Sequence, residues 1–241
     1  MSVSSSPSRQ IAARVGRRTA TVARAAYYAT GYRVRYPGKE SLEGRLHQWE
    51  TATGRGDVPL DQSRWDEQYG RGRWTFLSGI EEMAHYAVIV GYATFLKPHS
   101  SVLDVGCGAG VLHERFAAVG YERYTGVDLS RVAVDSLQDS TPPNAIFYAA
   151  DAATFTPPGT YDVIVFNESI TYFSDPMAVF AHYQQFLSPA GVVIVSCHIQ
   201  SPRANAILLQ LTRDHAVLDE TIIRQGKVSW RCVAFGETPP A

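Results

Sequence analysis

From residue 101 onward, the chain alternates short apolar runs with segments whose apolar residues recur at helical spacing. Runs that are apolar at almost every position predict strands buried on both faces, at 101–105, 124–127, 145–149, 161–166 and 192–197. The amphipathic segments between and after them predict helices at 111–119, 131–138, 177–187 and 205–217. This alternation indicates an α/β fold in which helices cover both faces of a mostly parallel sheet.

The two ends of this pattern differ from its middle. Near the C-terminus, strand-like stretches at 221–224 and 228–235 flank Gln225-Gly226, which predicts an antiparallel hairpin at the sheet edge. Upstream, an apolar stripe predicts a helix over 81–96, and the aromatic-rich stretch 62–79 predicts a helix followed by a second short element. We therefore expect one domain over 61–241, with cap helices at 61–97 and the core at 98–236.

Residues 1–60 have a different composition. Residues 1–8 are polar and predicted to be disordered, 9–28 predict a basic amphipathic helix, and 31–61 contain turn residues typical of a linker. Residues 1–39 carry eight of the 22 basic side chains and none of the 23 acidic ones. The basic helix is interpreted as a surface helix with solvated arginines, with peripheral contact to an anionic membrane or an organellar transit peptide as alternatives.

The rest of the chain is acidic, with 14 basic side chains against 23 acidic ones. This balance argues against a nucleic-acid substrate, because phosphate contacts require clustered positive charge. No apolar run approaches the length of a membrane-spanning helix, and three scattered cysteines favour a reducing compartment. We therefore expect a cytoplasmic protein, with membrane contact through the N-terminus as the open question.

The glycine-rich loop at 106–110 (GCGAG) directly follows a predicted strand and opens a predicted helix. Glycines there let the backbone turn tightly and approach a ligand, and the helix N-terminus offers unpaired N–H groups. A dinucleotide fingerprint needs glycine at position 111, where this chain has Val111, and Asp104 would lie poorly beside a pyrophosphate. The spacing favours a cofactor that carries an amino acid over NAD.

Two further acids end the next strands. Asp128 ends the second predicted strand, where a carboxylate can accept both hydroxyls of a ribose. Its alternative role as a helix N-cap suits Ser130 better, because Ser130 lies nearer the helical run. Asp151 follows the third strand and could accept from an adenine amino group, while the Ala152 N–H donates to the ring; a plain turn is the alternative.

These segments resemble the motifs of class I S-adenosylmethionine-dependent methyltransferases. Residues 102–110 (VLDVGCGAG) are similar to the first motif and 126–130 (GVDLS) to the second. Residues 151–152 look like the adenine-contacting pair, 161–166 (YDVIVF) like the fourth-strand motif, and 186–192 (FLSPAGV) like the turn before the fifth strand, with Ala190 replacing a glycine.

The resemblance covers about residues 98–236. It implies a Rossmann-like three-layer sandwich with strand order 3-2-1-4-5-7-6 and an antiparallel last strand. It also implies S-adenosyl-L-methionine as the cofactor. The expected cofactor-binding residues are Tyr69, Asp104, Gly106, Cys107, Gly108, Gly110, Asp128, Leu129, Asp151, Ala152 and Asn167.

Methyl transfer from a sulfonium is an in-line displacement, so the protein mainly positions the acceptor, and only a hydroxyl acceptor needs a base. Glu168 and His198, which follow the fourth and fifth strands, are the candidate catalytic bases. Alternatively, Glu168 orients a loop or the cofactor's amino group, and His198 is a strand-end side chain without a catalytic role. Tyr172, Phe173 and Trp74 are the candidate substrate-binding residues. The histidines are too dispersed for a metal site.

The sequence thus predicts a methyltransferase acting on a small molecule, with O-methylation preferred because two bases are at hand. N-methylation of a small amine is the nearest alternative. An oxidoreductase with a nucleotide cofactor and a non-catalytic binding protein of the same fold are the others. The expected partner is a small-molecule methyl acceptor, not nucleic acid, and the sequence leaves the oligomeric state open.

Overall fold

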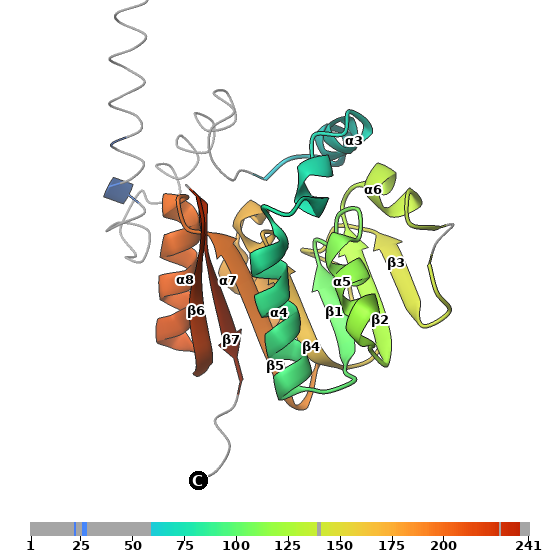
Figure 1. Cartoon of the computed structure of the whole chain (residues 1–241). Coiled ribbons are helices and arrows are strands. Elements are labelled where there is room, and N and C mark those ends of the chain that lie inside the picture. The colour runs from blue at the N-terminus through green and yellow to red at the C-terminus, as the bar shows by residue number, and fades with distance from the viewer. Residues whose placement is uncertain (1–21, 23–25, 28–58, 139–140, 227, 237–241) are drawn as a thin grey trace, which may run out of the picture.

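The computed structural model describes residues 22, 26–27, 59–138, 141–226 and 228–236 (Figure 1). The predicted basic helix and linker therefore lie almost entirely outside the described residues. The helices are α3 (Gln62–Gly70), α4 (Met83–Leu96), α5 (Val111–Val119), α6 (Arg131–Asp135), α7 (Pro176–Gln184) and α8 (Pro202–Asp214), with short 3₁₀ turns η2 (Thr75–Ser78) and η4 (Ile170–Tyr172). The strands are β1 (Ser101–Val105), β2 (Arg123–Asp128), β3 (Ala145–Ala149), β4 (Tyr161–Asn167), β5 (Leu187–His198), β6 (Val217–Gln225) and β7 (Val228–Phe235).

All seven strands form one sheet in the order β3-β2-β1-β4-β5-β7-β6. The pairs within β3-β2-β1-β4-β5 are parallel, and only β7 runs in the opposite direction, pairing antiparallel with β5 and β6. Helices α4 and α5 cover one face of the sheet and α7 and α8 cover the other (Figure 1). The predicted three-layer sandwich and its strand order are confirmed.

Each face of the sheet buries its own apolar cluster. On one face, Ile89 of α4 and Phe116 of α5 pack against central-strand residues such as Val163. On the other, Phe180 of α7 and Ile207 of α8 pack against residues of the same strands. A fully buried side chain of this size contributes roughly 1.5–3 kcal/mol. The two clusters hold the carboxyl ends of the strands in fixed positions.

The helix starts follow from local capping chemistry. The Ser130 hydroxyl accepts from the Ala133 N–H at 3.2 Å, so Ser130 is the N-cap of α6, as predicted. Asp175 and Ser201 cap α7 and α8 in the same way, and a proline follows each of them inside the first turn.

Several predicted boundaries were wrong at the C-terminal side of the sheet. The helix predicted to reach residue 217 ends at Asp214, because Val217 pairs with Phe235 and so begins β6. Strand β5 begins at Leu187, five residues before the predicted start, because Leu187 pairs with Tyr161 before a register shift. The helix predicted over 177–187 accordingly ends at Gln184.

On the other side of the sheet, α6 is shorter than the predicted 131–138. It ends at Asp135, and the chain turns where the Leu137 N–H donates to the Val134 carbonyl. The i→i+3 spacing of that bond belongs to a 3₁₀ turn rather than to a continuing α-helix.

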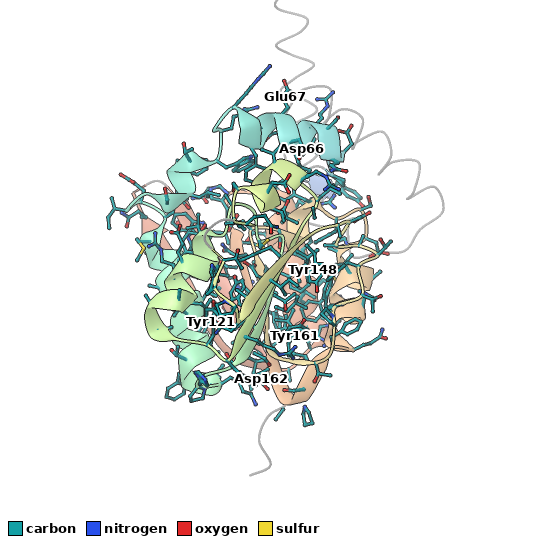
Figure 2. All side chains as sticks on the ribbon, turned by 90° about the vertical axis from the view of Figure 1, so that its right-hand side faces the viewer. Asp66, Glu67, Tyr121, Tyr148, Tyr161 and Asp162 are labelled. Atoms are coloured by element: carbon teal, nitrogen blue, oxygen red, sulfur yellow. The ribbon has the colours of Figure 1, made fainter. Side chains whose placement is uncertain are left out.

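The segment predicted as N-terminal cap helices divides into two parts. Helix α4 packs on the sheet and buries Ile89 and Ala93 there, so it belongs to a layer of the sandwich. Only α3 and η2 lie over an edge of the sheet. Figure 2 shows Asp66 of α3 at that edge and Asp162, at the start of β4, at the opposite one. We call α3 and η2 the lid.

Candidate active site

A cavity of about 840 Å³ opens at the carboxyl edge of the parallel strands, beneath the lid. Its volume lies within the usual range for small-molecule sites. It is lined by every predicted site residue except Gly110, namely Tyr69, Trp74, Asp104, Gly106, Cys107, Gly108, Asp128, Leu129, Asp151, Ala152, Asn167, Glu168, Tyr172, Phe173 and His198. Residues that are distant in the sequence thus meet in one cavity.

The glycine positions of the loop have no room for a side chain. Gly106 and Gly108 have φ values of 83° and 52°, in the left-handed region. A Cβ on Gly108 would lie 2.5 Å from the Tyr69 hydroxyl oxygen, and one on Gly106 would collide with the Ser169 side chain. Gly110 differs: it precedes α5, and a Cβ there would press on Leu137 rather than enter the cavity.

Asp104 presents a buried carboxylate to the cavity. Its Oδ2 accepts from the Tyr124 hydroxyl at 2.6 Å, whereas Oδ1 has no hydrogen-bond partner among the described residues. Burial raises the pKa of Asp104 to about 7, and the Tyr124 hydrogen bond opposes that rise. An acceptor oxygen buried in this way has a physical need for a cationic or hydrogen-bonding ligand.

Asp128 is held in place by the backbone. Its Oδ2 accepts from the Gly108 N–H at 2.9 Å and its Oδ1 from the Ser130 N–H at 2.8 Å. Burial raises the pKa of Asp128, and these two bonds lower it. Each carboxylate oxygen can accept a second bond, so the pair can receive two neighbouring hydroxyls such as those of a ribose.

The third acid lies in a turn that follows β3. The exposed Asp151 accepts from the Ala153 N–H at 2.9 Å, and the Ala152 carbonyl accepts from the buried Tyr183 hydroxyl at 2.8 Å. Asp151 therefore has the turn role that the sequence left open, and it also lines the cavity. Leu129 lines the cavity beside Asp128 and adds an apolar contact to this part of the wall.

Aromatic side chains cover the cavity from the lid. The rings of Trp65 and Tyr172 meet edge to face with centroids 5.1 Å apart, and Trp65 also lies 5.8 Å from Trp74. The Trp74 Nε1–H is buried without a partner among the described residues. Tyr69 completes the cluster at 6.3 Å from Trp74, so two of the candidate substrate-binding residues, Trp74 and Tyr172, lie in one aromatic cluster.

Asp66, which the sequence did not single out, connects the lid to the sandwich. It accepts from the Ser130 hydroxyl at 2.7 Å and from the Val132 N–H at 3.2 Å, at the start of α6. Nothing in the sequence distinguishes Asp66 from other surface acids, because its partners lie 64 and 66 residues away.

At the other end of the cavity, Glu168 and His198 lie near three residues that sequence reasoning missed: Glu82, Tyr86 and Trp230. The Glu168 N–H donates to the Ser196 carbonyl at 2.9 Å, and Glu168 itself adopts φ 56°. His198 pairs with Trp230 across β5 and β7, with ring centroids 6.4 Å apart. The four-residue spacing of Glu82 and Tyr86 was a sequence signal that could have found these two, and nothing comparable marks Trp230.

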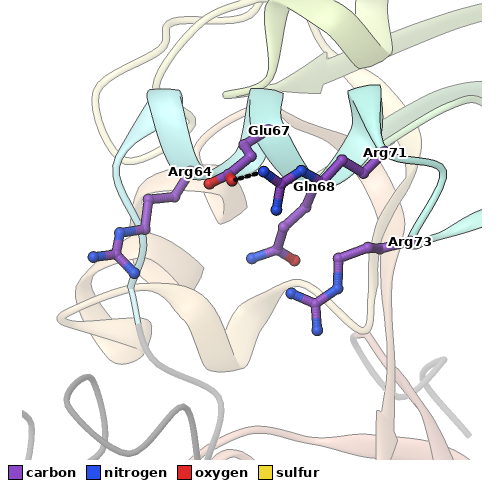
Figure 3. Close-up of a pocket in the computed structure, with 5 residues that line it drawn as sticks. All are labelled: Arg64, Glu67, Gln68, Arg71 and Arg73. Atoms are coloured by element: carbon purple, nitrogen blue, oxygen red, sulfur yellow. Dashed lines mark ion pairs between the residues drawn. The ribbon is translucent and has the colours of Figure 1, made fainter. Parts of the chain in front are cut away.

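A second, smaller hollow of about 100 Å³ lies on the outer side of α3 (Figure 3). Arg71 forms an ion pair with Glu67 at 2.8 Å there. Arg64, Gln68 and Arg73 complete its lining. None of these residues lines the large cavity.

The chain matches a family model described as a methyltransferase domain over residues 80–224. It is 32% identical over 143 residues to a phosphoethanolamine N-methyltransferase of Triticum aestivum, covering 57% of this chain and 27% of the relative. It is 30% identical over 144 residues to a ubiquinone biosynthesis O-methyltransferase of Xanthomonas campestris, covering 56% of this chain and 60% of the relative.

Solved structures share the fold at low identity. The N-methyltransferase NodS from Bradyrhizobium japonicum, in complex with S-adenosylhomocysteine, matches with a TM-score of 0.60 and 18% identity over 69% of this chain and 92% of its own. The 1,6-didemethyltoxoflavin-N1-methyltransferase of Burkholderia thailandensis matches with a TM-score of 0.60 and 18% identity, over 76% and 93%.

Because the family model covers more than half of the chain, the protein belongs to the class I S-adenosylmethionine-dependent methyltransferases. The predicted family is confirmed, and S-adenosylmethionine is its cofactor. Within the described residues, no helix is long and apolar enough to cross a membrane. The same residues hold no cluster of three side chains suited to a metal ion.

Proposed function

We propose that the protein transfers the methyl group of S-adenosylmethionine to a small molecule, preferably to a hydroxyl oxygen. One observation carries the proposal: two side chains able to accept a proton, Glu168 and His198, line the same cavity as Asp104 and the glycine loop. The cofactor, when bound, supplies an electrophilic methyl group. A hydroxyl becomes a competent nucleophile towards it when a base removes its proton.

The cofactor end of the cavity fits the proposed ligand. The unpartnered Oδ1 of Asp104 suits the cofactor's ammonium group, and Asp128 suits its ribose. Gly106 and Gly108 line the cavity without a Cβ, so the backbone there can come close to a ligand. Asp151, Ala152 and Leu129 would then receive the adenine.

The rest of the cavity would receive the acceptor. Tyr172, Phe173 and Trp74 exclude water above it and orient it, which is the main contribution a protein makes to an in-line displacement. His198 would take the hydroxyl proton, since an imidazole is matched to neutral pH, and Glu168 is the second candidate. Asn167 lines the cavity between the two ends.

N-methylation of a small amine is the alternative function. It needs no base when the amine is neutral, and the wheat relative and both structural neighbours are named as N-methyltransferases. Membership of the methyltransferase family removes the oxidoreductase alternative. The intact glycine loop and acids argue against a non-catalytic role, because a scaffold has no physical need for them.

The test begins with S-adenosylhomocysteine binding by calorimetry and with methyl transfer from labelled S-adenosylmethionine to pooled small-molecule extracts. His198→Ala is expected to lower kcat about a hundredfold or more while leaving S-adenosylhomocysteine affinity unchanged. His99→Asn is the matched control, because His99 is exposed, lies outside the cavity and has φ 53°, which asparagine tolerates. Unchanged turnover in His198→Ala would remove the base from the proposal.

A further inference from the structure

The part of the cavity beyond the glycine loop has a distinct composition, and we call it the acceptor end. It lies between the lid, α4, the loop after β4 and the paired ends of β5 and β7. Its members used below are Trp74, Phe76, Glu82, Tyr86, Asn167, Glu168, His198 and Trp230.

Two carboxylates, those of Glu82 and Glu168, line the acceptor end with Tyr86. Glu82 and Tyr86 lie one turn apart on the same face of α4, and both line the cavity. The Tyr86 hydroxyl is hydrogen-bonded with Asn167. Burial raises the pKa of Tyr86, and the charges of Asp104, Glu82 and Glu168 raise it further. Glu82, near the start of α4, and Glu168, after β4, therefore line the acceptor end together with Tyr86.

Aromatic faces stand beside these carboxylates. The Trp230 ring stacks on His85 with centroids 4.8 Å apart, and His85 lies 4.2 Å from the Tyr86 ring. His85 Nδ1 lies 3.7 Å from the Glu82 carboxylate. Burial lowers the pKa of His85 to about 4, so at neutral pH this imidazole adds no positive charge to balance Glu82.

The described residues that line the cavity include several acidic side chains. Among the described residues that line it, there is no lysine or arginine. Arg64 of the lid, and Arg71 and Arg73 between α3 and η2, line the outer hollow instead (Figure 3). The acidic residues in the wall are Glu82, Asp104, Glu114, Asp128, Asp151 and Glu168.

A phosphate or carboxylate placed here would lose its hydration and meet charges of its own sign. An ammonium group would gain both ion pairing and contact with aromatic faces, and cation–π contacts strengthen when they are desolvated. In the proposed function Asp104 and Asp128 receive the cofactor, and the acids that line the acceptor end are Glu82 and Glu168.

We propose, building on the function proposed above, that the methyl acceptor carries an ammonium group, held by Glu82 and Glu168 in the acceptor end that Tyr86 and Trp230 also line. An ammonium nitrogen that keeps its proton has no lone pair to attack a methyl group. The ammonium group therefore anchors the acceptor, and a different atom of the same molecule is methylated.

The test uses three probes that differ mainly in charge: phenethylammonium, 2-phenylethanol and 3-phenylpropanoate. Each is titrated into protein saturated with S-adenosylhomocysteine, and binding is followed by ligand-observed NMR. Phenethylammonium is expected to bind about tenfold or more tightly than the neutral probe, and 3-phenylpropanoate more weakly than either. Glu82→Gln is expected to remove this preference.

The control Glu81→Gln is expected to keep the preference, because Glu81 is the exposed neighbour of Glu82 and lies outside the cavity. Glu168→Gln is the second variant, used if Glu82→Gln unfolds at the temperature of the assay, and it should also weaken the preference. Equal binding of the three probes, no binding of any, or a preference for 3-phenylpropanoate would overturn the proposal. Failure of the proposed function is a separate result: the protein would bind no S-adenosylhomocysteine and methylate nothing in the extracts.

Discussion

Substitution of Gly108 by alanine tests whether the lid and the glycine loop form one site. The substitution has two costs. Alanine at φ 52° costs about 1–2 kcal/mol wherever the left-handed conformation occurs. The new Cβ would also lie 2.5 Å from the Tyr69 hydroxyl oxygen, and overpacking of this kind costs about 1–3 kcal/mol. Because that oxygen is the tip of a side chain on α3, the strain is expected to displace the lid.

Two further variants separate these costs. Gly226 has a similar φ of 59° and open space around it. Gly226→Ala should therefore lower the free energy of unfolding by about 1–2 kcal/mol without changing the affinity for the cofactor. Tyr69→Phe removes the colliding oxygen and leaves the Cζ atom at 3.4 Å, so it should recover part of the stability of Gly108→Ala. Stability is measured by urea unfolding, and cofactor affinity by titration with S-adenosylhomocysteine.

Gly108→Ala is expected to weaken S-adenosylhomocysteine binding about tenfold or more, while Gly226→Ala binds like the original protein. The reasoning would be refuted if the two alanine variants lost equal stability and bound the ligand equally well. It would also be refuted if Tyr69→Phe gave Gly108→Ala no recovery, because the collision would then not be the cause.

Three other predictions concern the acids and the N-terminus. Burial raises the pKa of Asp104 to about 7, so this group stabilises the fold below pH 4 and loses that contribution, on the order of 4 kcal/mol, as the pH rises to 7. The free energies of unfolding of the original protein and of Asp104→Asn, measured in urea, should therefore diverge over that range. A difference that stays constant with pH would contradict the prediction. Asp128→Ala should weaken S-adenosylhomocysteine binding about tenfold to a hundredfold in calorimetry. Asp135→Ala is the control and should leave the affinity unchanged, because Asp135 is exposed. Equal affinities of the two variants would exclude Asp128 from the ribose site. Deleting residues 1–39 should abolish any sedimentation with anionic liposomes and preserve activity. Undiminished liposome binding by the shortened chain would exclude this segment as the membrane contact, and loss of the fold would mean that the segment packs on the rest of the protein.

The sequence predicted the sheet and the cofactor loop because both produce patterns among residues that are neighbours in the sequence. Five parallel strands show as apolar runs, and a glycine loop between strand and helix shows as a short motif. The prediction that all five are buried on both faces was wrong for β3, which lies at the sheet edge and buries only Phe147. The acids Asp104, Asp128 and Asp151 lie at or just after the ends of three of these strands. Since the carboxyl ends of parallel strands meet at one edge of a sheet, the strand pattern alone was enough to predict that these acids share a site.

The acceptor end could not be predicted in the same way. Glu82 and Tyr86 lie on a helix whose apolar stripe reads as ordinary core, and Trp230 lies on the one reversed strand. They meet Asn167 only because α4 packs beside β5 and β7. The wrong start of β5 has the same origin, because Leu187 pairs with Tyr161 of β4, which no local periodicity records. Strand β6 starts early because its hairpin with β7 extends to the pair Val217 and Phe235.

The reversed direction of β7 has a practical consequence for attaching the protein to other molecules. Its first residues, with Trp230, lie at the cavity, and it ends beside Val193 of β5, towards the far edge of the sheet. A fusion partner or a solid support joined downstream of Gly236 would therefore approach from the side away from the cavity mouth. One joined just upstream of Pro59, which lines the cavity, would sit at its entrance and compete with incoming molecules.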